Sequence, residues 1–267
     1  IEYMPEILPA GDGETAALLR KALEKEGLKV RTGTKAVGYE KKPDGLHVLL
    51  EAAQGGGQEE IVVDKILVAV GRRPRTEGLG LEGAGVKVDE RGFIQVNARM
   101  ETSAPGVYAI GDVARPPLLA HKAMREGLVA AENAAGKNAL FDFQVPSVVY
   151  TGPEWAGVGL TEEEAKKAGY RVKVGKFPLS ASGRALTLGG AEGLVKVVGD
   201  AETDLLLGVF VVGPQAGELI AEATLALEMG ATVSDLGLTI HPHPTLSEGL
   251  MEAAEALHKQ AIHILNR

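Results

Sequence analysis

Two short unbroken apolar runs constrain the fold of this chain more than any other feature. Ile66–Val70 is followed at once by a glycine, and Gly106–Ile110 ends in a Gly-Asp turn. Apolar runs of this length that end in a glycine turn are typical of strands buried in a parallel sheet. Helical spacing over Gly13–Glu26 lies between strand signals at residues 1–4 and 28–31, and a second helical segment at residues 119–135 follows the run at 106–110. This alternation predicts an α/β fold.

Other strand signals surround these runs. Turn clusters rich in proline and glycine separate three segments that we expect to form a small antiparallel sheet, at residues 36–41, 46–52 and 60–63. Shorter strands are expected at residues 1–4, 28–31 and 93–96.

The pattern changes after Pro146, where strands are grouped with helices and no longer alternate with them. Strands are predicted at residues 147–150, 156–160, 170–177, 194–198 and 206–212, and helices at 161–169, 214–229 and 247–265. This grouping predicts a separate α+β domain. The expected domains are therefore residues 1–71, 72–146 and 147–267.

Charge and cysteine content exclude several functions. The net charge of −8 argues against a nucleic-acid partner, because neutralising phosphates requires clustered Lys and Arg. No apolar run approaches the roughly 18 residues of a membrane span. The chain contains no cysteine, so it has no thiolate metal site and no cysteine nucleophile. We expect a cytoplasmic protein without a metal site. Because the chain starts at Ile1 and not at a methionine, we also expect it to be a fragment.

A histidine–proline arm precedes the last predicted helix. His241 and His243 each stand before a proline, which holds both on stiff, extended backbone. Such an arm can hold an imidazole as an acid/base group, with Glu248 as its carboxylate partner. Thr245 and Glu248 also have the spacing of a helix capping box, in which the carboxylate binds a backbone N–H. The spacing alone leaves both interpretations open.

The Gly111-Asp112 turn is a second candidate site. Ligands of α/β sheets bind at the carboxyl ends of strands, and the start of the following helix favours phosphate. Asp112 would then bind a sugar hydroxyl. The alternative is that Gly-Asp forms only a stable turn.

Five segments taken together resemble the flavin-dependent pyridine nucleotide–disulfide oxidoreductases. They occur in the order of that family, and the resemblance extends over essentially the whole chain. The segments are ILVAVGRRP (66–74), TSAPGVYAIGDV (102–113), LLAH (118–121), GPQAGELI (213–220) and HPTLSE (243–248). The resemblance implies a partial FAD/NAD fold of two Rossmann-like nucleotide-binding domains. Residues 1–71 would be the second half of the NAD-binding domain, 72–146 the returning segment of the FAD-binding domain, and 147–267 the dimerisation domain.

The His-x-His-Pro-Thr-Leu-Ser-Glu pattern is similar to the family members that reoxidise protein-bound dihydrolipoamide with NAD. By this resemblance His243 is the acid/base residue and Glu248 orients it, whereas His241 is expected to have a positional role. The resemblance implies a homodimer in which this histidine reaches the redox disulfide of the other subunit. It also implies, as protein partner, the lipoyl-bearing acyltransferase of a 2-oxoacid dehydrogenase complex.

The resemblance also implies residues that bind the two cofactors. Glu2 would accept hydrogen bonds from the adenosine ribose and so favour NAD over NADP, with Ala36 and Gly71 as further NAD contacts. The FAD contacts would be Gly111, Asp112, Leu118, Leu119, Ala120 and His121.

The amino-terminal half of the family pattern, with the Cys-x4-Cys disulfide and both glycine-rich loops, does not occur in this chain. We therefore expect the C-terminal portion of a longer enzyme. Three alternatives are a glutathione-reductase-like enzyme, a transhydrogenase flavoenzyme and a non-catalytic dimerisation fragment. The first prefers NADP and has basic residues where this chain has Glu2 and Tyr3, and the second does not need a histidine directed at a dithiol.

Overall fold

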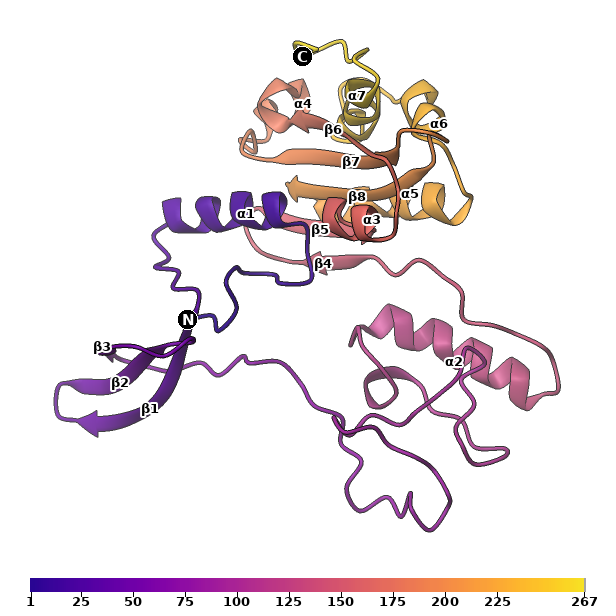
Figure 1. Cartoon of the computed structure of the whole chain (residues 1–267). Helices are drawn as coiled ribbons and strands as arrows, with labels where there is room; N and C mark the ends of the chain where they lie inside the picture. The colour runs from indigo at the N-terminus through magenta and orange to yellow at the C-terminus, as the bar shows by residue number, and fades with distance from the viewer. Residues whose placement is uncertain (267) are drawn as a thin grey trace. The chain divides into compact units, whose positions relative to one another are not determined.

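The computed structural model describes residues 1–266 and divides into two compact units (Figure 1). One unit joins Ile1–Ile66 to Gln144–Arg267, and the other is Leu67–Phe143. The helices are α1 (Gly13–Lys25), α2 (Ala120–Ala134), α3 (Glu162–Lys167), α4 (Gly183–Thr187), α5 (Ala216–Glu228), α6 (Val233–Leu238) and α7 (Glu248–Leu257). The strands are β1 (Thr34–Lys42), β2 (Gly45–Ala52), β3 (Gln58–Val63), β4 (Ser147–Val149), β5 (Glu154–Gly159), β6 (Val172–Pro178), β7 (Leu194–Asp200) and β8 (Leu206–Gly213).

A five-stranded antiparallel sheet in the order β4-β5-β8-β7-β6 is the centre of the first unit. All eight residues of β8 are buried, which explains why this antiparallel strand reads as a continuous apolar run. Side chains of a strand alternate between the two faces of a sheet. Val209 and Val211 therefore pack in one hydrophobic cluster, and Phe210 and Val212 pack in another.

Helices cover both faces of this sheet. The cluster that contains Val209 also contains Ile220 of α5, Leu236 of α6 and Leu250 of α7. The opposite cluster contains Leu19 of α1 and Ala165 of α3. Burial of apolar side chains in the first of these clusters holds α5, α6 and α7, and therefore the arm between α6 and α7, on one face of the sheet.

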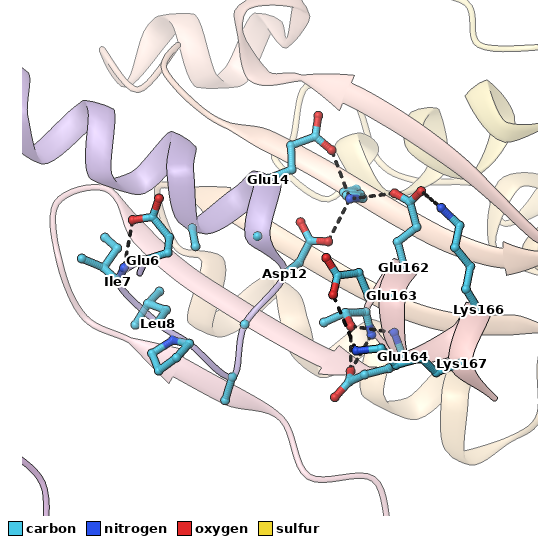
Figure 2. Close-up of a pocket in the computed structure, with 17 residues that line it drawn as sticks. Glu6, Ile7, Leu8, Asp12, Glu14, Glu162, Glu163, Glu164, Lys166 and Lys167 are labelled. Atoms are coloured by element: carbon cyan, nitrogen blue, oxygen red, sulfur yellow. Dashed lines mark hydrogen bonds and ion pairs between the residues drawn. The ribbon is translucent and has the colours of Figure 1, made fainter. Parts of the chain in front are cut away.

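The start of α1 and the start of α3 flank a surface pocket of about 610 Å³ (Figure 2). Its lining is mostly charged. The carboxylates are those of Glu6, Asp12, Glu14, Glu162, Glu163 and Glu164, and the amines those of Lys166, Lys167 and Lys196.

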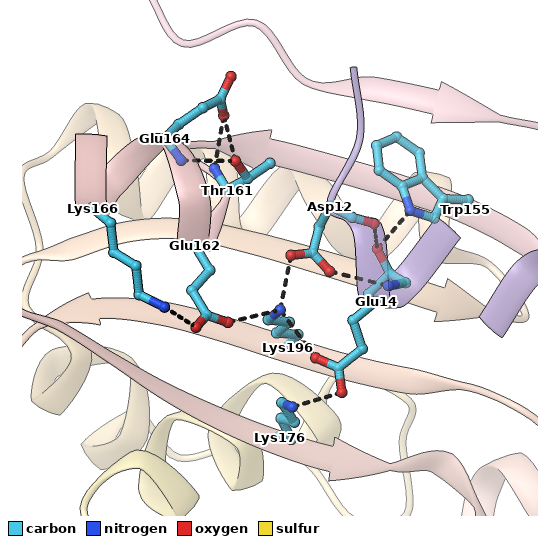
Figure 3. A network of polar contacts seen from close by, with 10 residues as sticks. Asp12, Glu14, Trp155, Thr161, Glu162, Glu164, Lys166, Lys176 and Lys196 are labelled. Carbon is cyan, nitrogen blue, oxygen red and sulfur yellow. Dashed lines mark hydrogen bonds and ion pairs between the residues drawn. The ribbon is translucent and has the colours of Figure 1, made fainter. Parts of the chain in front are cut away.

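A buried lysine joins α1 and α3 to the sheet at this pocket (Figure 3). Nζ of Lys196, a side chain 2% exposed on β7, lies 2.8 Å from Asp12, 3.0 Å from Glu14 and 3.4 Å from Glu162. Burial acts to lower the pKa of Lys196, but its hydrogen bonds to Asp12 and Glu14 raise that pKa above its usual value. Asp12 also accepts the backbone N–H of Thr15 and so caps α1.

A separate three-stranded antiparallel sheet follows α1, in the order β1-β2-β3. Its register is continuous except for an irregularity between Ala36 and Gly38. The expected antiparallel sheet between residues 36 and 63 is therefore confirmed.

The second unit is built around α2 and two small clusters. One cluster contains Val86, Ile94 and Ala109, which precede α2 in the chain. The other cluster packs Met100 against Val129 of α2. Asn133 ties the end of α2 to the rest of this unit, since its amide group binds the backbone of Arg99 and Ala139.

Several strand predictions are wrong. Residues 1–4, 28–31, 66–70, 93–96 and 106–110 are not strands, although two isolated bridges, Val88 with Ile94 and Glu101 with Tyr108, lie in or beside them. A strand is stable only when its backbone groups pair with a neighbour. In the part of the chain that the structure describes, no named strand lies alongside residues 66–70.

The last helix is shorter than predicted, and the short helices α4 and α6 were not predicted. α7 ends at Leu257, and Lys259 adopts a left-handed conformation with φ of 62°. The chain then turns back, because the backbone N–H groups of Ile262 and His263 donate to the buried carboxylate of Glu252.

Candidate functional site

The arm between α6 and α7 carries an exposed histidine that is fixed by a carboxylate. Nδ1 of His243 lies 2.8 Å from Oε1 of Glu248, the first residue of α7. The His243 side chain is 71% exposed, whereas that of Glu248 is 16% exposed. Because an ionised carboxylate only accepts hydrogen bonds, Nδ1 of His243 donates. Nε2 is then the ring nitrogen that can take up a proton from a bound substrate.

Glu248 also binds the backbone of the arm. Its Oε2 accepts the N–H of Thr245 at 2.7 Å, while Oγ1 of Thr245 donates to the carbonyl of Pro242. Partial burial acts to raise the pKa of Glu248, but the Thr245 N–H and the His243 ring together hold that pKa below its usual value. The Glu248 carboxylate thus orients the imidazole and binds the backbone of the arm. Glu248 is the first residue of α7 and Ser247 is the N-cap, so Thr245 and Glu248 do not form the capping box that their spacing allowed.

Close packing fixes the helix that begins at Glu248. A Cβ atom on Gly175 of β6 would lie 1.9 Å from the carbonyl oxygen of Ala253. A Cβ on Gly249 would lie 3.1 Å from Val195 of β7. The backbone of α7 therefore approaches the sheet to a distance that only glycine permits.

His241 lies on the same arm but points into the protein. Its side chain is 4% exposed, and Nε2 lies 2.7 Å from Oε1 of Glu222 on α5. Its Nδ1 lies 2.8 Å from the carbonyl oxygen of Thr239. The structure therefore brings His243 and Glu248 together and places His241 in a separate polar contact.

In the second unit, Gly111 and Asp112 form a short 3-10 turn that precedes α2. Gly111 has φ of 70°, and a Cβ on it would lie 3.2 Å from Ala123 of α2. Its N–H donates to Oε2 of Glu126 at 2.7 Å. The side chain of Asp112 is 44% exposed, and one oxygen lies 3.5 Å from Nη1 of Arg72. Glycine therefore permits the close approach of turn and helix, and the Asp112 carboxylate faces outward.

Glu126 supports this turn from inside the unit and was missed by the sequence analysis. It is fully buried and lies 2.9 Å from Nζ of Lys122 and 3.2 Å from Nε of Arg115. The spacing of Lys122 and Glu126, four residues apart on a helix, was the available signal.

The remaining FAD candidates lead into α2. Leu118 and Leu119 are half-buried, whereas Ala120 and His121 are exposed in the first turn of the helix. Leu119 is the N-cap, and no side chain among the described residues binds the helix start there. The first backbone N–H groups of a helix favour an anion.

The NAD candidates are distributed over both units. The backbone of Glu2 pairs with Arg31 and Thr34, and its carboxylate accepts the N–H of Met4 at 2.8 Å. Ala36 is an exposed residue of β1, close in the chain to Thr34. Gly71 belongs to the other unit, where it is exposed and has φ of 93°.

The charged pocket in Figure 2 contains none of these candidates. Several of its carboxylates bind lysines beside them, as in the contacts of Lys196 with Glu14 and of Lys166 with Glu162. Within residues 1–266, no three His, Asp or Glu side chains come together as a metal site. None of the helices in that range is long and apolar enough to cross a membrane.

Two family models match the chain. Residues 1–127 match the pyridine nucleotide-disulphide oxidoreductase model, and residues 145–254 match the dimerisation domain of the same family. The chain therefore belongs to the pyridine nucleotide–disulphide oxidoreductases. Its fold class is confirmed as a mixed α/β fold with a C-terminal dimerisation domain.

The relatives include dihydrolipoyl dehydrogenases from several organisms, two of which illustrate the match. The one from Thermus scotoductus is 97% identical over 267 residues, which are 100% of this chain and 58% of that protein. The one from Haloferax volcanii is 47% identical over 269 residues, with 100% of this chain and 56% of that protein covered. The chain thus spans between half and two thirds of the length of these relatives.

Solved structures show the same fold. The HOCl-induced flavoprotein disulfide reductase RclA from Escherichia coli has a TM-score of 0.85 at 25% identity, over 95% of this chain and 57% of that one. LpdA from Mycobacterium tuberculosis has a TM-score of 0.83 at 28% identity, over 96% of this chain and 55% of that one.

Proposed function

We propose that the whole protein is a flavoprotein that reoxidises protein-bound dihydrolipoamide with NAD. The observation that carries this proposal is the outward-facing imidazole of His243, held by Glu248 2.8 Å away, in a chain 97% identical to a dihydrolipoyl dehydrogenase. The reaction converts one dithiol and NAD⁺ to one disulfide, NADH and a proton. Electrons would pass through a redox disulfide that is not in this chain, since the chain contains no cysteine.

In this proposal His243 moves the proton. Nε2 takes a proton from a thiol of the substrate, and the thiolate attacks the redox disulfide. The resulting imidazolium stabilises the thiolate beside it. Glu248 keeps Nδ1–H as the donor and stabilises the positive charge of the ring, as carboxylates do behind catalytic histidines in general.

The cofactors proposed are FAD and NAD. Asp112 would accept hydrogen bonds from the hydroxyl groups of the sugar-like chain of FAD. The start of α2 would lie along the flavin through Leu118, Leu119, Ala120 and His121. Gly111 fits this role because its lack of a side chain lets the turn approach α2. Glu2, Ala36 and Gly71 would contact NAD. Bound FAD supplies a two-electron carrier between the disulfide and NAD.

The proposal includes a homodimer, in keeping with the dimerisation-domain match over residues 145–254. His243 would act on the disulfide of the partner subunit. We further propose a cytoplasmic location, and the lipoyl-bearing acyltransferase of a 2-oxoacid dehydrogenase complex as the protein partner.

The test is a substrate comparison with the purified whole protein. NAD reduction by dihydrolipoamide is measured beside NADPH oxidation by glutathione disulfide and hydride exchange between NADH and NADP. The proposal predicts that only the first reaction is fast. Fast turnover of glutathione disulfide would favour the glutathione-reductase-like alternative, and hydride exchange alone would favour a transhydrogenase. Absence of flavin and of all three activities would favour a non-catalytic dimerisation fragment.

A further inference from the structure

His241 forms a polar contact that the proposed chemistry does not use. Both of its ring nitrogens lie within hydrogen-bond distance of oxygen atoms, at 2.7 Å from Glu222 and 2.8 Å from the carbonyl of Thr239. A carbonyl oxygen only accepts, so Nδ1 donates to Thr239. An ionised carboxylate also only accepts. The two side chains therefore share one proton that joins Nε2 to the carboxylate of Glu222.

This contact ties the arm to a helix that is itself fixed on the sheet. Glu222 lies on α5, between the fully buried Ile220 and Ala223. The His241 side chain is 4% exposed and that of Glu222 is 36% exposed, so the imidazole is buried and the contact as a whole is partly buried. The backbone of His241 is thereby held against a rigid element.

The position of His241 makes this contact important for His243. Only Pro242 separates the two histidines, and the fixed φ of proline leaves the backbone between them few conformations. On the other side of His243, Leu246 is buried and Thr245 binds Glu248. His243 itself has an exposed side chain, so it does not fix its own position by packing. Its backbone is held from both sides.

We infer that His241 and Glu222 are positioning residues, which fix the arm so that His243 meets its dithiol substrate in one orientation. This inference rests on the proposed function. The two residues touch neither substrate nor cofactor and act only through the backbone of the arm. Loss of either contact lets the imidazole of His243 depart from the geometry for proton transfer, and displacements of about 1 Å in a reacting group can lower a rate roughly 100-fold.

The experiment uses the whole flavin-containing protein and four variants. His241→Ala and Glu222→Ala remove the contact. Glu222→Gln keeps it without the charge, because the amide NH₂ donates to a neutral Nε2 while Nδ1 still donates to Thr239. Glu218→Ala removes the same charge from an exposed position on the same helix and serves as the matched control.

Two readouts are measured for each variant. The first is kcat/KM for dihydrolipoamide, compared with dye reduction by NADH, which bypasses the disulfide and His243. The second is the hydrogen-exchange rate of the Thr245 amide, which donates to Glu248 at 2.7 Å. His241→Ala and Glu222→Ala should lower the dithiol kcat/KM by about 10- to 100-fold. They should spare dye reduction and speed amide exchange severalfold. Glu222→Gln and Glu218→Ala should resemble the unaltered protein.

Three outcomes would overturn the inference. Unchanged dithiol kinetics in His241→Ala would mean that the arm holds its position without this contact. Equal loss of dithiol and dye activities would mean a general effect on folding. If Glu222→Gln were as impaired as Glu222→Ala, charge and not position would be the function of the pair. If the unaltered protein lacks dithiol activity, the proposed function fails, and Thr245 exchange alone then decides whether the contact holds the arm.

Discussion

Nζ of Lys196 lies 2.8 Å from Oδ2 of Asp12, and both side chains are almost fully buried. The two residues are 184 positions apart in the chain, and their contact joins the capped end of α1 to strand β7 of the five-stranded sheet. Taking two charges out of water is costly, and their attraction offsets this cost only while both partners are present.

Lys196→Met should therefore destabilise the protein by about 3–5 kcal/mol, the usual cost of leaving a buried charge without its partner. Asp12→Asn in the same chain should restore part of this loss, because the amide oxygen still caps α1. Lys176→Met is the control, since Lys176 binds Glu14 at an exposed site and should contribute at most about 1 kcal/mol. Urea unfolding measures all three. Equal effects of the Lys196 and Lys176 variants would contradict this account.

Gly175→Ala tests the packing of α7 on the sheet. The new Cβ would overlap the carbonyl of Ala253, so the helix must move, at a cost of about 1–3 kcal/mol. Because α7 begins at Glu248, the dithiol activity should fall as well. Gly183→Ala is the control, because a Cβ there has no atom within 4 Å. The same midpoint of thermal unfolding for both variants would contradict the close packing of α7 on the sheet.

The stability contributed by Glu248 should depend on pH. Its pKa is lowered in the folded protein from an ordinary value of 4.5. A lowered carboxyl pKa stabilises the fold above the unfolded-state value and ceases to do so as pH falls through the folded-state value. The stability difference between the unaltered protein and Glu248→Gln should therefore shrink as pH is lowered from about 6 to about 3, which is roughly 1.5 units on either side of that ordinary value.

Glu163→Gln is the control for this pH series, since it removes the same charge from a side chain that is 86% exposed. Urea midpoints at each pH give the comparison. A stability difference for Glu248→Gln that stays constant across the series would show that the contacts with Thr245 and His243 do not stabilise the ionised form.

Asp112→Ala should weaken flavin binding. Hydrogen bonds to charged groups contribute about 1.5–3 kcal/mol, which corresponds to a loss of affinity of roughly 10- to 100-fold. Asp142→Ala removes an exposed carboxylate from the same unit and should leave binding unchanged. Flavin fluorescence after dilution of the whole protein measures release. Equal retention of flavin by both variants would contradict the assignment of Asp112 to the FAD site.

The sequence predicted the strands of both antiparallel sheets. Every strand of the five-stranded sheet was expected, because alternating or fully apolar segments bounded by turns mark strands even when the order in the sheet is not known. The run at residues 66–70 has the same composition, yet Leu67 and Val70 are 90% and 92% exposed. Apolar composition alone does not create the neighbouring strand that a strand requires.

The candidate site was predicted in part. The residues of the arm suggested either an orienting carboxylate or a capping box of Thr245 and Glu248. Glu248 does contact the His243 ring and the Thr245 N–H, but the N-cap of α7 is Ser247 and not Thr245. No local pattern links His241 to Glu222, which is 19 residues earlier on another helix. Lys196 and Asp12 are farther apart still. Such contacts depend on how helices pack on the sheet, which local spacing does not encode.

The most direct test of the proposed function is His243→Gln in the whole protein. Loss of acid/base catalysis typically lowers a rate by about 10²–10⁴. We predict a loss of this size in NAD reduction by dihydrolipoamide, with NADH-dependent dye reduction and flavin content unchanged. Equal loss of both activities, or no loss of either, would contradict the assignment of His243 as the residue that takes the proton of the dithiol.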